Sequence, residues 1–350
     1  MASASATTPT LPSTQTVWKI VRKGVPAKAL VKEENAPVPK KIPKGNVLVK
    51  IQAASLNPVG YKMMRMAPNS FLKRIAEYDF AGEVVDANGN LQFKVGDQVF
   101  GSIPVGESFK TGQGALAQYT YVPAKATAHR PEGITPNEAS GIAIVALTAY
   151  TALYHIGKLE AGQRIFVNGG STSVGIYTIQ LAKALGCKVY ASASGKNEEF
   201  LKSLGVDEFY DYTKQPIHEA LVQNPPSSKF DVIFEAVGHA YIPLYTHSEA
   251  YLAPNGTYIS VGPTPDGFSE TLSLLWNFFM HPKWAGGTKR RFEILRINKT
   301  GELLDEIAKA ITDGKVKPVI DSVYKFEDVL SAYDKILTGH ARGKVVVEVS

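Results

Sequence analysis

A short turn rich in glycine and hydroxyl groups offers the clearest chemistry in this sequence. It follows an apolar segment, residues 165–167, and precedes apolar residues at helical spacing. Small residues let backbone N–H groups approach a pyrophosphate, whose charge is favoured by the N-terminal end of a helix dipole. We therefore predict that the turn binds the phosphates of a dinucleotide through Gly170, Ser171, Thr172, Ser173, Val174 and Gly175.

The spacing of this turn departs at one place from the dinucleotide fingerprint. Gly170, Thr172 and Gly175 stand at its 0, 2 and 5 positions, so a threonine replaces the middle glycine. A plain structural turn between a strand and a helix is the alternative. The flanking pattern favours the dinucleotide, because a strand at 165–167, a helix stopped by Gly186 and a strand at 188–193 form one βαβ unit.

The residues after the second expected strand bear on which nicotinamide cofactor binds. NAD-binding units place an Asp or Glu about 20 residues beyond the first glycine, on the ribose 2′-hydroxyl. Here residues 192–197 are Ser-Ala-Ser-Gly-Lys-Asn, with no acid before Glu198. Ser194 and Lys196 can donate hydrogen bonds and positive charge to a 2′-phosphate, which a carboxylate would repel. The sequence therefore favours NADPH.

Further cofactor contacts are predicted where later strands end. Val237 and Gly238 follow one strand and Val261 and Gly262 another, at the carboxyl ends where open α/β sheets bind ligands. Near the end of the chain Arg342 and Lys344 could also face the cofactor, and surface charge is the competing interpretation.

Candidate catalytic residues lie in the N-terminal part of the chain. Asn57 could fix the nicotinamide ribose or a substrate oxygen, and Tyr61, Lys62 and Tyr78 could supply a hydrogen bond or a proton. Asn57 has a structural alternative as a turn-forming residue before proline, and the two tyrosines as packed aromatic rings. Solvent could also deliver the proton.

No metal site is predicted. A catalytic zinc needs three protein ligands that converge on one point. The chain has the single Cys187 and seven scattered histidines, of which His155, His239 and His247 are interpreted as surface or satisfied residues.

Without a strong Lewis acid, alcohol oxidation is disfavoured. Hydride addition to a conjugated alkene gives an enolate that needs only hydrogen-bond donors and a proton, and quinones accept electrons by similar logic.

Two kinds of pattern divide the chain. Short strands punctuated by turn residues, at 17–20, 46–53, 80–85, 98–100 and 117–122, predict a mostly antiparallel β domain. From Gly162 strands and helices alternate, which indicates a parallel sheet covered on both faces. We predict an α/β fold with a disordered tail at 1–15, a β domain at 16–140 and 318–350, and a doubly wound Rossmann domain at 141–317.

Composition excludes several classes of function. The net charge of +6 is dispersed, so a nucleic-acid partner is not implied. No apolar run approaches the ~20 residues of a membrane span, and the most hydrophobic one, residues 272–280, is short. The first fifteen residues lack the apolar block of a signal peptide and the arginines of a presequence, so a cytoplasmic location is expected.

Several short motifs occur in one order along almost the whole chain. They are Ser55-Leu-Asn-Pro58, Tyr78-Asp-Phe-Ala-Gly-Glu83, Gly96-Asp97, Leu147-Thr-Ala-Tyr-Thr-Ala152, the turn at Gly169, Leu204-Gly-Val-Asp207 with Asp211-Tyr212, and His340-Ala-Arg-Gly-Lys344. With these motifs the chain resembles the zinc-free branch of the medium-chain dehydrogenase/reductase superfamily. It looks most like the quinone oxidoreductase-like enzymes, including chloroplast-envelope homologues and fungal enoyl reductases.

This resemblance implies a GroES-like β domain and a Rossmann domain with the cofactor in the cleft between them. It places Thr148 beside the nicotinamide, and Lys196 and Tyr212 beside the 2′-phosphate. Zinc-dependent relatives have their ligands at the places of Asn57-Pro58 and Glu77-Tyr78-Asp79, whereas other relatives usually carry an aspartate at the place of Gly60.

The implied activity is reduction of quinones or α,β-unsaturated carbonyl compounds by NADPH. A trans-acting enoyl reductase of a polyketide or fatty-acid pathway and a non-catalytic NADPH-binding protein are the alternatives. Similar proteins are often homodimers, which is the assembly expected here. An apolar group at Phe278, Phe279, Met280 and Trp284 could wall a substrate pocket or a dimer contact.

Overall fold

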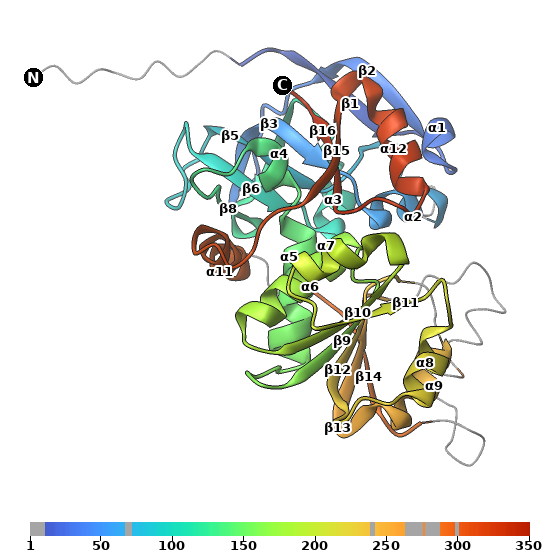
Figure 1. Cartoon of the computed structure of the whole chain (residues 1–350). Coiled ribbons are helices and arrows are strands. Elements are labelled where there is room, and N and C mark those ends of the chain that lie inside the picture. The colour runs from blue at the N-terminus through green and yellow to red at the C-terminus, as the bar shows by residue number, and fades with distance from the viewer. Residues whose placement is uncertain (1–10, 67–71, 239–241, 263–275, 277–287, 298–300) are drawn as a thin grey trace, which may run out of the picture. The chain divides into compact units, whose positions relative to one another are not determined.

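A computed structural model describes residues 11–66, 72–238, 242–262, 276, 288–297 and 301–350 (Figure 1). His239, the apolar run 272–280 except for Trp276, and the apolar group from Phe278 to Trp284 lie outside the described residues. The chain forms two compact units, and the first comprises Met1–Ile144, Lys299–Thr312 and Pro318–Ser350. The second comprises Val145–Asn298 and Asp313–Lys317. Among the described residues, no helix is both long and apolar enough to cross a bilayer.

The first unit is built on two sheets of mainly antiparallel strands. One has the order β2-β1-β4 and the other the order β15-β16-β3-β5-β6-β8, with β7 paired to β3. Their bounds are β1 Thr14–Ile20, β2 Leu30–Pro37, β3 Asn46–Ser55, β4 Arg74–Ile75, β5 Asp79–Asp86, β6 Gln98–Ser102, β7 Tyr119–Pro123, β8 Thr127–His129, β15 Ile320–Lys325 and β16 Lys344–Glu348.

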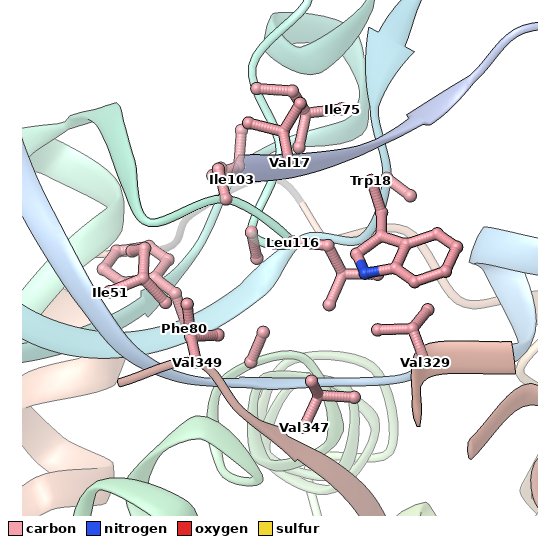
Figure 2. Packing of buried hydrophobic residues seen from close by; sticks show 14 of the residues in the cluster. Val17, Trp18, Ile51, Ile75, Phe80, Ile103, Leu116, Val329, Val347 and Val349 are labelled. Atoms are coloured by element: carbon pink, nitrogen blue, oxygen red, sulfur yellow. The ribbon is translucent and has the colours of Figure 1, made fainter. Parts of the chain in front are cut away.

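The end of the chain completes this first unit. Strand β16 inserts antiparallel to β3, and the Trp18 indole Nε1 donates a hydrogen bond of 2.8 Å to the carbonyl oxygen of Phe326. Trp18, Val329 and Val347 share one apolar core with residues of β3 and β5 (Figure 2). The predicted return of the C-terminal chain to the β sheet is therefore present in the fold.

Helices of the first unit are short. They are α1 Pro26–Ala29, α2 Pro58–Met66, α3 Val105–Thr111, α4 Pro136–Ser140, α11 Gly301–Thr312 and α12 Val329–Leu337. Residues 301–312 fall within the range predicted for the Rossmann domain, yet their contacts group them with the first unit. A Cβ on Gly301 would meet the backbone of Lys125, so α11 begins directly against this unit.

The second unit is a parallel sheet with the order β11-β10-β9-β12-β13-β14. Numbered from β9 along the chain this order is 3-2-1-4-5-6, the doubly wound Rossmann arrangement. The strands are β9 Arg164–Asn168, β10 Lys188–Ala193, β11 Glu208–Asp211, β12 Phe230–Glu235, β13 Leu252–Ser260 and β14 Arg291–Ile294. The helices are α5 Ala143–Tyr150, at the boundary of the units, α6 Ser173–Ala184, α7 Glu198–Ser203, α8 Ile217–Gln223 and α9 Ile242–Thr246. The predicted α/β fold class is confirmed.

Candidate active site

The turn between β9 and α6 has the geometry of an anion-binding helix start. Thr172 is the N-cap of α6, and its Oγ1 accepts a hydrogen bond of 3.0 Å from the N–H of Gly175. The same hydroxyl donates to the carbonyl oxygen of Gly169 at 2.8 Å. The threonine that replaces the middle glycine therefore links the turn to the start of the helix by hydrogen bonds. Threonine is one of the residues preferred at helix N-caps.

Gly175 is required by a close approach between the helix and the turn. A Cβ on this residue would collide with the Gly169 carbonyl oxygen and lie 2.9 Å from the Gly170 Cα. Gly169 itself has φ of +84°, a conformation that side chains disfavour. Glycine at 169 and 175 therefore follows from backbone packing, independently of any ligand.

Replacing Thr172 by valine is expected to lower the free energy of unfolding by about 1 kcal/mol, because it removes an N-cap acceptor without changing the shape. Thr172→Ser keeps the hydroxyl and is the matched control. Urea denaturation of both variants tests this, and equal unfolding free energies for valine and serine would contradict it.

A buried carboxylate, Glu235, lies where the strand order reverses between β9 and β12. It ends β12 with 1% of its surface exposed, and it accepts hydrogen bonds from the N–H groups of Val237 (2.8 Å) and Gly238 (3.2 Å). The Ser260 hydroxyl also donates to it at 3.2 Å, and the N–H of Gly262 donates to that hydroxyl at 3.2 Å. One carboxylate thus holds both loops that the sequence predicts as nicotinamide contacts.

Burial raises the pKa of Glu235 to about 7, while its bonds from Val237, Gly238, Ser260 and Asn168 oppose that rise. Sequence reasoning named Val237, Gly238, Val261 and Gly262 and missed Glu235. The signal was an acid that directly follows the apolar residues Val232, Ile233 and Phe234 at the end of a strand.

The predicted 2′-phosphate residues follow β10 and β11. Ser194 is half-buried and Lys196 exposed, both at the short 3-10 turn Gly195–Asn197, and the N–H of Tyr212 donates to the Ala193 carbonyl at 3.2 Å. These residues therefore border one corner of the sheet.

Asp211, which the sequence analysis named only as part of a family motif, lies beside this corner. A Cβ on Gly195 would be 2.5 Å from its Oδ2, so the carboxylate flanks the segment of Ser194 and Lys196. Asp211 Oδ1 accepts bonds from the Thr213 hydroxyl (2.7 Å) and N–H (2.9 Å), and these help to lower its pKa. The carboxylate is thereby tied to its own loop.

The first unit contains a second polar cluster, buried at the base of β3, β5 and β16. Lys344 Nζ donates to Asn57 Oδ1 at 2.6 Å and to Asp79 Oδ2 at 3.2 Å, and Asn57 Nδ2 donates to Asp79 Oδ2 at 3.1 Å. Their exposed fractions are 3% for Lys344, 2% for Asn57 and 0% for Asp79. Buried charges of this kind are stable only when paired and hydrogen-bonded.

Glu77 joins this cluster to α12. Its Oε1 accepts a hydrogen bond of 2.6 Å from the Tyr333 hydroxyl, and its Oε2 accepts one of 3.2 Å from the N–H of Asn57. Burial raises the pKa of Glu77 to about 8, although Tyr333 and Lys344 pull it down. Of this cluster the sequence predicted functional roles only for Asn57 and Lys344. Glu77 and Asp79 were named only as the residues at places where zinc-dependent relatives have ligands, and no role was predicted for Tyr333.

The remaining predicted residues are placed as follows. Tyr61 and Lys62 lie half-buried on α2, Tyr78 is buried before β5, and Thr148 is buried on α5 in the second unit. Burial raises the pKa of Tyr61, and raises that of Tyr78 to about 12, so both remain neutral phenols at pH 7. Arg342 is exposed, and its N–H donates to Asp321 at 2.7 Å. The structure therefore joins Asn57 to Lys344 and leaves Arg342 at the surface.

Two family models match different parts of the chain. Residues 43–132 match the alcohol dehydrogenase GroES-like domain, and residues 204–347 match the family described as zinc-binding dehydrogenase. A trans-enoyl reductase of Aspergillus terreus is 34% identical over 97% of this chain and 98% of its own length. A chloroplast envelope quinone oxidoreductase homologue of Arabidopsis thaliana is 33% identical over 90% of this chain and 93% of its own.

A solved structure agrees with these relatives. The quinone oxidoreductase from Coxiella burnetii superposes with a TM-score of 0.79 at 25% identity, covering 96% of this chain and 99% of its own. The full-length similarity to named oxidoreductases and the matches to both domains establish the family. The chain belongs to the medium-chain dehydrogenase/reductase superfamily of oxidoreductases.

Proposed function

We propose that this protein is a zinc-independent, NADPH-dependent reductase of quinones or of the C=C bond of α,β-unsaturated carbonyl compounds. The observation that carries the proposal is the buried cluster of Asn57, Asp79 and Lys344, in which the Lys344 ammonium group donates to both of the other side chains. The names of the relatives, quinone oxidoreductase and trans-enoyl reductase, support the same class of reaction.

A zinc ion is implied by the description of one matching family, and the residues at this place do not suit it. Asn57 Oδ1 and Asp79 Oδ2 both bind the Lys344 ammonium, so two of the candidate ligands already share a cation. The chain's one cysteine, Cys187, lies in the second unit beside the carbonyl oxygen of Glu160. Among the described residues, no group of three His, Cys, Asp or Glu side chains could hold a metal.

The residues of the second unit suit a dinucleotide. The N–H groups at the start of α6 would bind its pyrophosphate, and the loops held by Glu235 would bind the nicotinamide end. Ser194, Lys196 and Tyr212 would hold a 2′-phosphate, which is the basis for proposing NADPH. When bound, this cofactor supplies a hydride.

The residues of the first unit would serve the substrate. A hydride acceptor becomes an enolate or a hydroquinone anion, which needs hydrogen-bond donors and a proton. Tyr61 is proposed to supply the proton because it is half-buried, retains its proton at neutral pH and lies on α2 next to Asn57. Asn57 would orient the reacting carbonyl, since its amide is fixed by Lys344 and Asp79.

A trans-acting enoyl reductase is the second candidate. It is favoured by the 34% identity to the Aspergillus terreus enzyme over 97% of the chain. The chemistry is the same, and the substrate would be a carrier-bound enoyl thioester. Turnover of that thioester together with inactivity on free enones separates this candidate from the first.

Oxidation of NADPH and of NADH with a quinone, an enone, a 2-alkenal and a simple aldehyde tests the proposal. Turnover of the quinone or the enone with NADPH, and none of the aldehyde, is the expected result. Binding of NADPH without turnover of any of these compounds or of an enoyl thioester would contradict a reductase and leave a non-catalytic NADPH-binding protein.

Replacing Lys196 by alanine is expected to raise KM for NADPH by about tenfold, since one charge-assisted hydrogen bond to the 2′-phosphate is lost, while KM for NADH stays the same. Lys202→Ala is the matched control, because this exposed lysine bonds Glu198 at 2.6 Å. Steady-state kinetics with both cofactors measures the effect. An equal change for NADPH and NADH would show that Lys196 does not contact the 2′-phosphate.

A further inference from the structure

The carboxylate of Glu77 occupies the space that a side chain on residue 60 would fill. A Cβ on Gly60 would collide with Glu77 Oε1 and lie 2.7 Å from its Cδ and 2.9 Å from its Oε2. Gly60 lies in the first turn of α2, and both residues are buried. A glycine is therefore needed at 60 because the carboxylate arrives there from another segment.

The backbone of Glu77 shows a matching irregularity. Its φ is +61°, in the left-handed region that costs a non-glycine residue about 1 kcal/mol or more. This strain directs the side chain to the start of α2, where it accepts from the Asn57 N–H and the Tyr333 hydroxyl. Residue 60 is thus a glycine at the place that the Glu77 carboxylate reaches. Residue 77 is a glutamate in a backbone conformation that a glycine would adopt without strain.

We propose that Glu77 is a positioning residue, whose carboxylate ties the Asn57 turn and the start of α2 to α12, and that a carboxylate borne by residue 60 can replace it. The inference rests on the proposed function, because Asn57 and Tyr61 flank this anchor and are the residues proposed to meet the substrate.

Charged and titratable groups surround this carboxylate on every side. Tyr333 faces it from α12, Lys344 from β16, Asp79 from β5 and Tyr61 from α2, and Tyr78 is its neighbour in sequence. Lys344 is the cation among them, and it also binds Asp79. Its positive charge is therefore shared between Asp79 and Glu77. This arrangement agrees with the raised pKa of about 8.

An exchange of residues tests the placement. Glu77→Gly alone should lower kcat on the order of 100-fold, because the turn that holds Asn57 loses its anchor. Gly60→Asp alone should also be impaired, since two carboxylates would compete for one space. The double variant Gly60→Asp/Glu77→Gly should recover kcat to within about tenfold of the wild type. A double variant no better than Glu77→Gly overturns the proposal.

Two controls separate this inference from simple changes of stability. Lys73→Gly relieves a similar left-handed residue, with φ of +68°, outside the cluster, and should leave kcat unchanged. If the wild type turns over no substrate, the proposed function fails, and thermal unfolding then decides the placement. In that case the double variant must recover the unfolding temperature lost in Glu77→Gly, and failure to do so overturns it.

The pH dependence of kcat supplies a readout that a merely space-filling role would not move. The folded-state pKa of Glu77, about 8, exceeds its ordinary value of 4.5, so the folded protein holds the proton more tightly. Its contribution to stability is therefore complete below pH 4.5 and is lost as the pH rises through 8. The isosteric Glu77→Gln should flatten the unfolding profile between these values and remove any step in kcat near pH 8. Profiles identical to those of the wild type contradict the role.

Discussion

Replacing Lys344 by methionine is expected to lower the free energy of unfolding by about 3 kcal/mol and to abolish most of the activity. The methionine removes the cation that pairs with Asp79, whose side chain is fully buried. Asp79 would keep only neutral donors, the Asn57 amide, the Ser55 hydroxyl and the N–H of Ile144, at 3.1, 3.5 and 3.3 Å. Because these donors remain, we expect the loss of unfolding free energy to lie at the lower end of the range for a broken buried ion pair.

A double variant shows whether the loss comes from an uncompensated charge. In Lys344→Met/Asp79→Asn neither charge remains, so most of the stability should return, while kcat stays low because Asn57 has lost the donor to its Oδ1. Urea denaturation gives the unfolding free energies and steady-state assays give kcat. A single variant within about 1 kcal/mol of the wild type would show that this pair contributes little.

Gly175→Ala is expected to weaken NADPH binding on the order of 100-fold. The added Cβ would meet the Gly169 carbonyl oxygen and the Gly170 Cα, and backbone atoms cannot rotate away as a flexible side chain can. The start of α6 must therefore move away from the turn, which misdirects the N–H groups proposed to bind the pyrophosphate.

Gly106→Ala is the matched control, because a Cβ there has no heavy atom within 4 Å. Fluorescence titration with NADPH gives the dissociation constants, and circular dichroism verifies that both variants are folded. An unchanged dissociation constant for a folded Gly175→Ala would contradict a cofactor site at this turn.

The sequence predicted best the elements whose signal is local. The turn at Gly169 and the strands predicted on either side of it, at 165–167 and 188–193, carry their pattern within a few residues, and all are present. Strand β2 was missed, because its partly exposed residues show no clean alternation. The segment from Pro136 to Ile156 is divided in the structure into α4, α5 and a π-helical segment, Thr151–Ile156.

The fold class and a dinucleotide-type turn could be predicted from the sequence, since each depends on residue types and on spacing over short stretches, and the family was indicated by the resemblance of several motifs. Tertiary structure alone decided which polar residues meet. Lys344 reaches Asp79 across 265 positions of sequence, and Tyr333 reaches Glu77 across 256. Such pairs form because β16 and α12 return to the first unit, and no periodic pattern within a short stretch of sequence predicts them. The same holds for Gly60, whose missing side chain is explained only by a carboxylate from another segment.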